Sequence, residues 1–352
     1  MRILHLLNHT ARQNGHVHAA VDLACAQKAL GHTVAVCSRG GDFGDLLNRR
    51  GVETIQFGAR STTRRAIRTL FALDAIFRAW RPDVVHAHMV TSAVLAWPST
   101  RLRRIVLVTT VHNEFAKSAV LMGLGDRVIA VSAAVHESMT RRGIPRRKLR
   151  TVLNGTIGCA RQDTPPPEGP ELDHPAVAFV GGLHPRKGVA DLIAAFDLCR
   201  ATIPEAHLYI VGEGPYAEAY SRQAAACSSA SNITFCGALE DPRGVLRRAD
   251  VFVLPSLSDP APLVIPEARE AQCAIIASAV DGIPELLDYG EAGVLTPPAA
   301  PKELARALER MLSSPATLEE WKLRAERDLD RFSVDRVARD AIDIYREALE
   351  AH

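Results

Sequence analysis

The strongest constraint on the fold is an alternation of short apolar runs with segments of helical periodicity, and it occurs twice along the chain. In the first half, apolar runs predict buried strands at 3–7, 33–37, 84–86, 105–111 and 127–131. Segments with helical spacing lie between them at 17–30, 66–80 and 133–142. Strand–helix alternation of this kind is typical of a parallel sheet covered by helices on both faces.

A proline-rich segment separates the two series. Residues 163–175 contain five prolines and one glycine, and proline lacks the amide donor that a helix interior or a central strand requires. We interpret this segment as an interdomain linker. After it, strands are predicted at 176–180, 207–211, 233–235, 251–254, 274–277 and 293–296, and helices at 189–200, 216–226, 243–248, 267–271, 284–287, 301–312, 318–331 and 334–349.

The predicted fold class is therefore α/β, with two Rossmann-like domains. We expect an N-terminal domain over 1–162, the linker over 163–175, a C-terminal domain over 176–332 and a final helical segment over 333–352. In open α/β sheets, ligands bind outside the carboxyl ends of the strands. Two such edges that face each other would enclose one deep, water-poor site.

The composition is that of a globular protein, with 47% hydrophobic and 23% charged residues. No apolar run approaches the roughly 18 residues of a membrane-spanning helix, and residues 1–7 become polar too soon for a signal peptide. The seven cysteines form no Cys-x-x-Cys pair, so we interpret them as free thiols in a reducing compartment. We expect a cytoplasmic location.

The small net charge conceals a strong asymmetry between the two halves. Residues 1–160 hold 23 Lys and Arg against 9 Asp and Glu, whereas the remaining residues hold 19 against 31. The basic surface either complements the acidic half or attracts an anionic membrane leaflet, where each basic residue contributes about 1 kcal/mol. No aromatic–basic pattern indicates nucleic acid. The basic clusters are Arg60, Arg64, Arg65 and Arg68; Arg101, Arg103 and Arg104; and Arg141, Arg142, Arg146, Arg147, Lys148 and Arg150.

The strongest local motif begins where the strand at 176–180 ends. Gly181 and Gly182 permit close approach of backbone to a ligand, and Arg186 and Lys187 stand just before the next helix. Cationic side chains beside a helix N-terminus suit a diphosphate. The alternative is an ordinary strand-to-helix turn with surface basic residues.

This motif closely resembles the phosphate-binding stretch of glycosyltransferase family 4, the retaining GT-B enzymes. Further blocks resemble the family in the same order along nearly the whole chain, at 14–15, 21–24, 31–34, 82–88, 110–113, 126–132, 152–155, 210–215, 249–256 and 282–285. The resemblance implies the GT-B architecture, with two Rossmann-like domains facing across a central cleft. It also implies that the last helix packs back on the N-terminal domain.

The resemblance further implies a donor diphosphate held near Lys187 and the Gly15 loop. Glu267 matches the second acid of the family's Glu-x7-Glu motif, which bonds the nucleotide ribose, and Asp259 holds the first position, which contacts sugar hydroxyls. His112 matches a histidine beside the donor sugar. A helix-start acid at Glu267 and a packing histidine at His112 are the alternatives. The implied catalytic residues are His112, Lys187, Arg186 and Asp259, and the implied donor-binding residues are Asn14, Gly15, Gly182, Gly212, Glu213, Gly214, Leu239, Val264 and Glu267.

Three positions depart from the family pattern. Gly182 stands where the family usually has arginine, so one diphosphate cation is missing, and Arg186 is a candidate substitute. Asp259 is one methylene shorter than glutamate. Pro260 and Pro262 replace residues of a glycine- and aromatic-containing loop, which removes two amide donors near the sugar.

Other classes of site are less consistent with the sequence. His9, His16 and His18 lie near the presumed cleft, but no carboxylate or cysteine completes a ligand set, and similar enzymes rely on protein cations. We therefore expect neither a metal nor another cofactor. The first strand leads into residues 7–11 without a Gly-x-Gly-x-x-Gly turn, which disfavours a dehydrogenase.

Together these features predict retaining transfer of a sugar from a UDP- or GDP-sugar to a hydroxyl of a glycan or lipid-linked acceptor. Cell-surface polysaccharide or glycoconjugate synthesis, on the cytoplasmic side and in peripheral contact with the membrane, is the expected setting. A catalytically silent binding subunit and a GT-B epimerase or phosphorylase are the alternatives.

Overall fold

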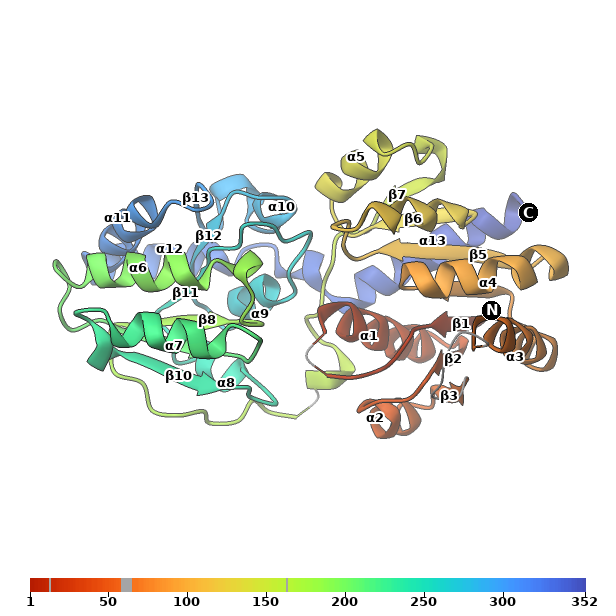
Figure 1. Ribbon diagram of the computed structural model, residues 1–352, viewed down its shortest axis with the longest axis horizontal. Coiled ribbons are helices and arrows are strands. Elements are labelled where there is room, and N and C mark those ends of the chain that lie inside the picture. Colours follow the sequence, from red (N-terminus) through yellow and green to blue (C-terminus); the bar gives the residue numbers. More distant parts are fainter. Residues whose placement is uncertain (13, 58–64, 163) are drawn as a thin grey trace. The chain divides into compact units, whose positions relative to one another are not determined.

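The computed structural model describes residues 1–352 except 13, 58–64 and 163, so Arg60, Arg64 and Asp163 of the segments above lie outside the described residues. The chain forms two compact units (Figure 1). Unit 1 comprises Met1–Asp163 and Asp330–His352, and unit 2 comprises Thr164–Leu329.

Unit 1 is built on a seven-stranded sheet in the order β3-β2-β1-β4-β5-β6-β7. Every neighbouring pair is parallel, and the central strands read as continuous apolar runs because helices cover both of their faces. Its strands are β1 (Arg2–Leu6), β2 (Thr33–Ser38), β3 (Glu53–Gln56), β4 (Val84–Ala87), β5 (Val106–Val111), β6 (Arg127–Ala130) and β7 (Leu149–Thr151).

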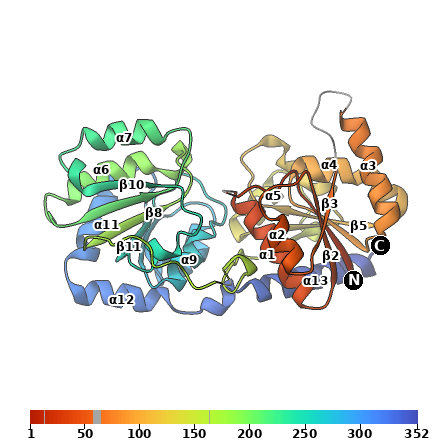
Figure 2. The same ribbon diagram turned by 90° about the horizontal axis from the view of Figure 1, so that it is seen from below.

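The last helix of the chain belongs to unit 1. Helix α13 (Val334–Glu350) runs beside α1 (Gly15–Ala29), as Figure 2 shows. Ala338, Ala341 and Tyr345 of α13 are fully or almost fully buried in one core cluster with Ile3 and Val106. The other helices of unit 1 are α2 (Gly44–Arg49), α3 (Arg65–Trp80), α4 (Val90–Arg103) and α5 (Ala133–Arg141), with 3-10 turns at Lys117–Leu124, Arg146–Lys148 and Ala160–Gln162.

Unit 2 is also built on a parallel sheet, with six strands in the order β10-β9-β8-β11-β12-β13. Its strands are β8 (Ala176–Val180), β9 (His207–Val211), β10 (Ile233–Gly237), β11 (Val251–Leu254), β12 (Ala274–Ser278) and β13 (Val294–Thr296). Its helices are α6 (Val189–Cys199), α7 (Ala217–Ala225), α8 (Arg243–Leu246), α9 (Val264–Glu270), α10 (Ile283–Leu286), α11 (Pro301–Leu312) and α12 (Pro315–Ala325). The two sheets confirm the predicted α/β class.

The helix predicted over 318–331 is wrong at its C-terminal end. Helix α12 ends at Ala325, and a separate 3-10 turn follows at Leu329–Phe332. Two features accompany the end of the helix. Asp328 has a left-handed backbone conformation with φ 52°. The buried Arg269 guanidinium donates to the carbonyls of Ala325 and Arg327 in place of helix amides.

The described part of the proline-rich segment packs along unit 2. Arg243 donates to the Thr164 carbonyl (3.0 Å), and the Asp173 amide donates to the Tyr209 hydroxyl (2.7 Å). A Cβ on Gly169 would lie 2.6 Å from the Gly244 carbonyl carbon, so the two backbones touch. Of the helices in the described ranges, none is both long enough and apolar enough to cross a membrane.

Candidate functional site

In unit 2, the polar residues that the sequence singled out gather at the carboxyl edge of the sheet. Lys187 Nζ donates to Asp259 Oδ2 at 2.5 Å, and the two side chains are only 13% and 9% exposed. Arg186 Nη1 donates to the Ser258 carbonyl (2.8 Å) and lies 3.7 Å from Asp259 Oδ1. Three of the four predicted catalytic residues therefore form one charged cluster.

A single glycine explains how residues 72 positions apart in the chain come together. Gly188, at the start of α6, has φ +68°, and a Cβ there would lie 1.9 Å from the Pro255 carbonyl oxygen. The turn before α6 therefore packs directly on the loop after β11. The Leu257 amide donates to the Arg186 carbonyl (2.7 Å) and fixes the register of the two loops.

Asp259 is held from several sides. Ser256 Oγ donates to Asp259 Oδ2 (3.2 Å), and the Asp259 amide donates to Asp281 Oδ2 (2.7 Å). Asp281 also accepts from Ser258 Oγ (2.5 Å). Sequence reasoning missed Asp281, and the available signal was its place after β12, at the same edge of the sheet. These bonds order the loop in which Pro260 and Pro262 offer no amide.

The glycines at 212 and 214 have a structural explanation within unit 2. Gly212 has φ +136°, and a Cβ there would lie 1.9 Å from the Gly181 carbonyl oxygen. A Cβ on Gly214 would lie 2.5 Å from the Leu183 oxygen, and the Leu183 amide bonds the Glu213 carbonyl at 2.9 Å. The loop after β9 therefore supports the glycine turn after β8, backbone against backbone.

Other predicted donor-binding residues follow neighbouring strands at the same edge. Leu239 lies after β10 and is 38% exposed. Val264 and Glu267 lie in α9, after β11, and both are half-buried. A Cβ on Gly182 would lie 3.2 Å from His184 Cδ2, and the other nearby atoms would be at 3.7 Å or more. The turn therefore has room for a side chain if His184 shifts slightly.

In unit 1, the remaining predicted residues also lie at the carboxyl edge of the sheet. Asn14 precedes α1, Gly15 is its first residue, and His112 follows β5. A Cβ on Gly15 would have nothing within 4 Å, so packing does not require glycine there. The His16 ring lies 6.1 Å from both the His9 ring and the His112 ring, measured between centroids.

Two ring nitrogens at this edge stand out. His112 Nδ1 and His16 Nε2 are buried, and neither has a hydrogen-bond partner within the described ranges. Burial lowers the pKa of His112 to about 3, so its ring is neutral near pH 7. Buried polar atoms in native proteins are nearly always bonded, and two such atoms together mark a place where a ligand can supply the bonds.

The histidines whose nitrogens lie closest together are not those that the sequence suggested for a metal. Nitrogens of His5, His86 and His88 lie within 4.8 Å of one another. Each of their six ring nitrogens, however, is hydrogen-bonded to a protein side chain. His18 instead packs edge-on against Phe43, 5.6 Å between centroids. The three rings therefore form part of a hydrogen-bond network within the protein.

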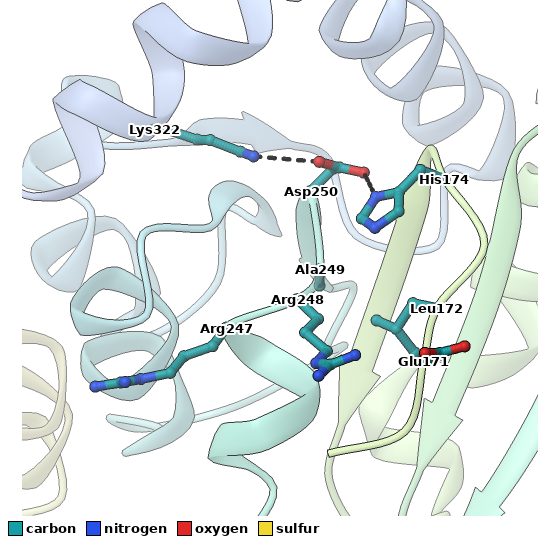
Figure 3. A pocket seen from close by; sticks show the side chains of 8 residues that line it. All are labelled: Glu171, Leu172, His174, Arg247, Arg248, Ala249, Asp250 and Lys322. Atoms are coloured by element: carbon teal, nitrogen blue, oxygen red, sulfur yellow. Dashed lines mark hydrogen bonds and ion pairs between the residues drawn. The ribbon is translucent and has the colours of Figure 1, made fainter. Parts of the chain in front are cut away.

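A recess of about 520 Å³ in unit 2 lies away from these residues (Figure 3). Its lining includes residues just before β8 and β11, at the amino ends of the strands. His174 (2.6 Å) and Lys322 (3.2 Å) both bond the Asp250 carboxylate, as the dashed lines in Figure 3 mark. This recess is at the opposite edge of the sheet from Lys187, so we do not assign it to the candidate site.

Comparisons with known proteins identify the family of the chain. Residues 13–156 match the model of Glycosyltransferase Family 4, and residues 174–314 match that of Glycosyl transferases group 1. The chain is 30% identical to alpha-maltose-1-phosphate synthase of Mycolicibacterium smegmatis over 291 residues, which cover 76% of this chain and 73% of that one. It is 31% identical over 258 residues to glycogen synthase of Mycobacterium tuberculosis, covering 68% of this chain and 62% of that protein. The chain thus spans less than two thirds of the glycogen synthase.

The fold has close counterparts among solved structures. The structure of Anabaena HepE in complex with UDP and glucose superposes with a TM-score of 0.86 at 20% identity, covering 99% of this chain and 100% of that one. At this level of identity the likeness shows the fold alone. With the family models matching most of both units, the conclusion is that this chain belongs to glycosyltransferase family 4 and has the GT-B fold.

Proposed function

We propose that the protein is a retaining glycosyltransferase that moves a sugar from a UDP- or GDP-sugar to a hydroxyl of a glycan or lipid-linked acceptor. The observation that carries the proposal is the Lys187–Asp259 pair, with Arg186 beside it, after the glycine turn of β8. A cation and a carboxylate side by side suit a sugar diphosphate, whose phosphates need cations and whose hydroxyls need acceptors. The UDP bound in the HepE structure supports a nucleotide donor.

The proposed chemistry places charge stabilisation on protein cations. When the nucleoside diphosphate leaves, negative charge develops on its bridging oxygen. Lys187 and Arg186, together with backbone amides near Gly182, would stabilise that charge. Asp259 would then accept hydrogen bonds from sugar hydroxyls, while Glu267 would accept them from the ribose.

The retaining outcome follows from the family resemblance. We assign no residue as a covalent nucleophile and propose attack on the same face as the leaving group. The departing phosphate would assist deprotonation of the acceptor hydroxyl. Lys187 and Arg186 would supply the positive charge without a metal ion.

The experiment that tests this function is a screen of donors. UDP-, GDP- and ADP-sugars are each incubated with the protein, and release of the nucleoside diphosphate is followed with and without candidate glycan and lipid-linked acceptors. Thermal unfolding with each nucleoside diphosphate is measured in parallel, because a ligand that binds the native state raises Tm. Turnover of one donor, with the sugar's anomeric configuration retained by NMR, is the expected result.

A second candidate is a catalytically silent subunit that binds a nucleotide or glycan. Gly182 and the loop at 260–262, which lack a cation and two amide donors, favour it. A raised Tm with a nucleoside diphosphate but no sugar transfer or hydrolysis with any donor would support this reading over catalysis.

We also propose that the basic unit 1 contacts an anionic membrane surface in a cytoplasmic setting. Several basic side chains are paired within the unit, such as Arg103 with Asp74 and Arg127 with Glu347, but Arg104, Arg141 and Arg147 are exposed. Leu102 is also 77% exposed. Co-sedimentation with phosphatidylserine vesicles should weaken when Arg104 and Leu102 are replaced by Ser. Unchanged binding of that variant would exclude this surface as the contact.

A further inference from the structure

A continuous polar network runs through the core of unit 1 and ends at His112. Gln27 Oε1 lies 2.8 Å from His5 Nε2. His5 Nδ1 lies 2.9 Å from His88 Nε2, and His88 Nδ1 lies 3.0 Å from His112 Nε2. A side branch leads from Gln27 through Tyr345 and His86 to Thr110. The network therefore joins α1, β1, β4, β5 and α13.

The direction of every hydrogen bond in this network is set at Gln27. Its amide nitrogen lies 3.1 Å from the Tyr345 hydroxyl. In this orientation the amide nitrogen donates to the hydroxyl at a distance usual for an N–H donor. The amide oxygen consequently faces His5, and because it can only accept, His5 Nε2 carries a hydrogen.

The hydrogen on His5 determines those that follow. Burial lowers the pKa of His5 to about 4 and the pKa of His88 well below its ordinary value, so these rings are neutral. A neutral imidazole has one donor and one acceptor nitrogen. His5 Nδ1 accepts from His88 Nε2, and His88 Nδ1 accepts from His112 Nε2. His112 Nδ1 is then left with a bare lone pair.

His112 Nδ1, which carries this lone pair, is an atom for which the described part of unit 1 provides no hydrogen-bond partner. A lone pair repels a phosphate oxygen and attracts a hydroxyl hydrogen. The main line of the network ends at the Gln27 amide, and the side branch passes through the Tyr345 phenol and His86 to the Thr110 hydroxyl. Burial lowers the pKa of His86 well below its ordinary value, and the amide, the phenol and the hydroxyl take up no proton near neutral pH. The network is therefore suited to hold one tautomer and not to conduct a proton.

We propose that Gln27, His5 and His88 are positioning residues that hold His112 as the Nε2–H tautomer, so that Nδ1 accepts a hydrogen bond from a sugar hydroxyl. The identity of the ligand as a sugar rests on the proposed function, whereas the tautomer does not. His16 Nε2, the second buried nitrogen without a partner in the described ranges, lies on a neighbouring ring and offers the same ligand a further contact.

The tautomer is tested directly by ¹⁵N NMR of the histidine side chains in the full chain without ligand. The expected spectrum shows His112 with a pyrrole-like Nε2 and a pyridine-like Nδ1. A reversed Gln27 amide would reverse every donor and place the hydrogen on Nδ1. A pyridine-like Nε2 on His112 in the unaltered protein would therefore overturn the proposal without any variant.

Variants separate positioning from packing. His88→Leu removes the acceptor for His112 Nε2 and should produce a mixture of tautomers, with kcat lowered roughly tenfold to a hundredfold as for loss of an orienting partner. His88→Asn, whose side-chain oxygen can still accept, should restore most of the rate. Thr110→Val removes a bond only from the His86 branch and should leave the His112 tautomer unchanged. Wild-type spectra and rates in His88→Leu would refute the positioning role.

The ligand is tested with donors in which single sugar hydroxyls are replaced by fluorine, which cannot donate. One position should lower kcat/KM in the unaltered protein but have no further effect in His112→Ala. If no donor is turned over at all while the tautomer is as expected, the proposed function fails and the positioning network stands. If a donor is turned over and every fluorinated donor is equally affected in both proteins, the hydroxyl assignment fails.

Discussion

At the start of α1, Gly15 is exposed and has open space where a side chain would lie. A glycine that neither packing nor a left-handed backbone requires is a candidate for contact with a ligand. Gly44, the first residue of α2, has the same open surroundings. The two positions form a matched pair, one at the candidate site and one outside it.

We predict that Gly15→Ala stabilises the protein while it weakens donor binding. Replacing glycine at a compatible position raises the free energy of unfolding by about 0.4–1 kcal/mol. An inserted methyl group at a close contact costs about 1–3 kcal/mol, so donor Kd should rise roughly fivefold to a hundredfold. Urea unfolding and titration calorimetry measure the two effects. Gly44→Ala should give the first effect without the second, and equal donor affinity in Gly15→Ala would rule out the contact.

Gly182 offers the opposite experiment. The turn has room for a side chain beside His184, and a charge-assisted hydrogen bond contributes about 1.5–3 kcal/mol. We predict that Gly182→Arg lowers donor Kd by about tenfold or more, measured by calorimetry. Gly182→Gln, which adds length without charge, should have little effect. Weaker binding in Gly182→Arg would mean that the diphosphate does not lie at this turn.

At the scale of secondary-structure elements, the edge formed by β1, β4 and β5 couples stability to pH. Burial lowers the pKa of His5 to about 4 and the pKa of His112 to about 3, from 6.5. Below pH 6.5 the unfolded chain binds protons that the folded protein does not, so stability is full above pH 6.5 and falls as the pH decreases toward the folded values.

We predict a loss of about 2 kcal/mol for each such histidine between pH 7 and pH 5, where most carboxylates still remain ionised. Urea unfolding at the two pH values measures it, and His5→Gln should reduce the loss by one histidine's share. A free energy of unfolding that does not change over this range would contradict the neutral, buried network.

The sequence predicts the elements that carry buried apolar runs and misses those that do not. The central strands, such as β1 and β8, lie within a residue of their predicted ends. The sequence does not predict strand β3, because three of its four residues are exposed. It does not predict β7 either, which is only three residues long. Helix α4 contains Pro98 and many small residues, so its periodicity is weak. A local apolar pattern appears only where large apolar side chains are buried. Strands β3 and β7 bury few residues, and the buried residues of α4 are Ala, Ser and Thr.

The sequence predicts which residue types lie at the candidate site, but it does not predict which of them are in contact. The glycines and cations of the turn after β8 follow from local chemistry. The Lys187–Asp259 bond depends on the loop contact at Gly188, and the network at His112 joins residues as distant as His5 and Tyr345. Only tertiary structure brings these together.

For the whole molecule, the chain forms two Rossmann-like units, each with polar residues at the carboxyl edge of its own parallel sheet. Helix α13 returns the end of the chain to unit 1 and contributes Tyr345 to the histidine network. The proposed cations, Lys187 and Arg186, belong to unit 2, whereas Gly15 and His112 belong to unit 1. The central claim is that Lys187 stabilises the departing diphosphate.

The most direct measurement is sugar transfer, or donor hydrolysis, by Lys187→Ala beside a matched control, Lys322→Ala. Lys322 bonds Asp250 at the opposite edge of the same sheet, so its loss removes a similar ion pair away from the site. Removal of a preorganised charge stabiliser should lower kcat of Lys187→Ala on the order of a hundredfold or more, with Lys322→Ala near the unaltered rate. Equal turnover in both variants would contradict the account.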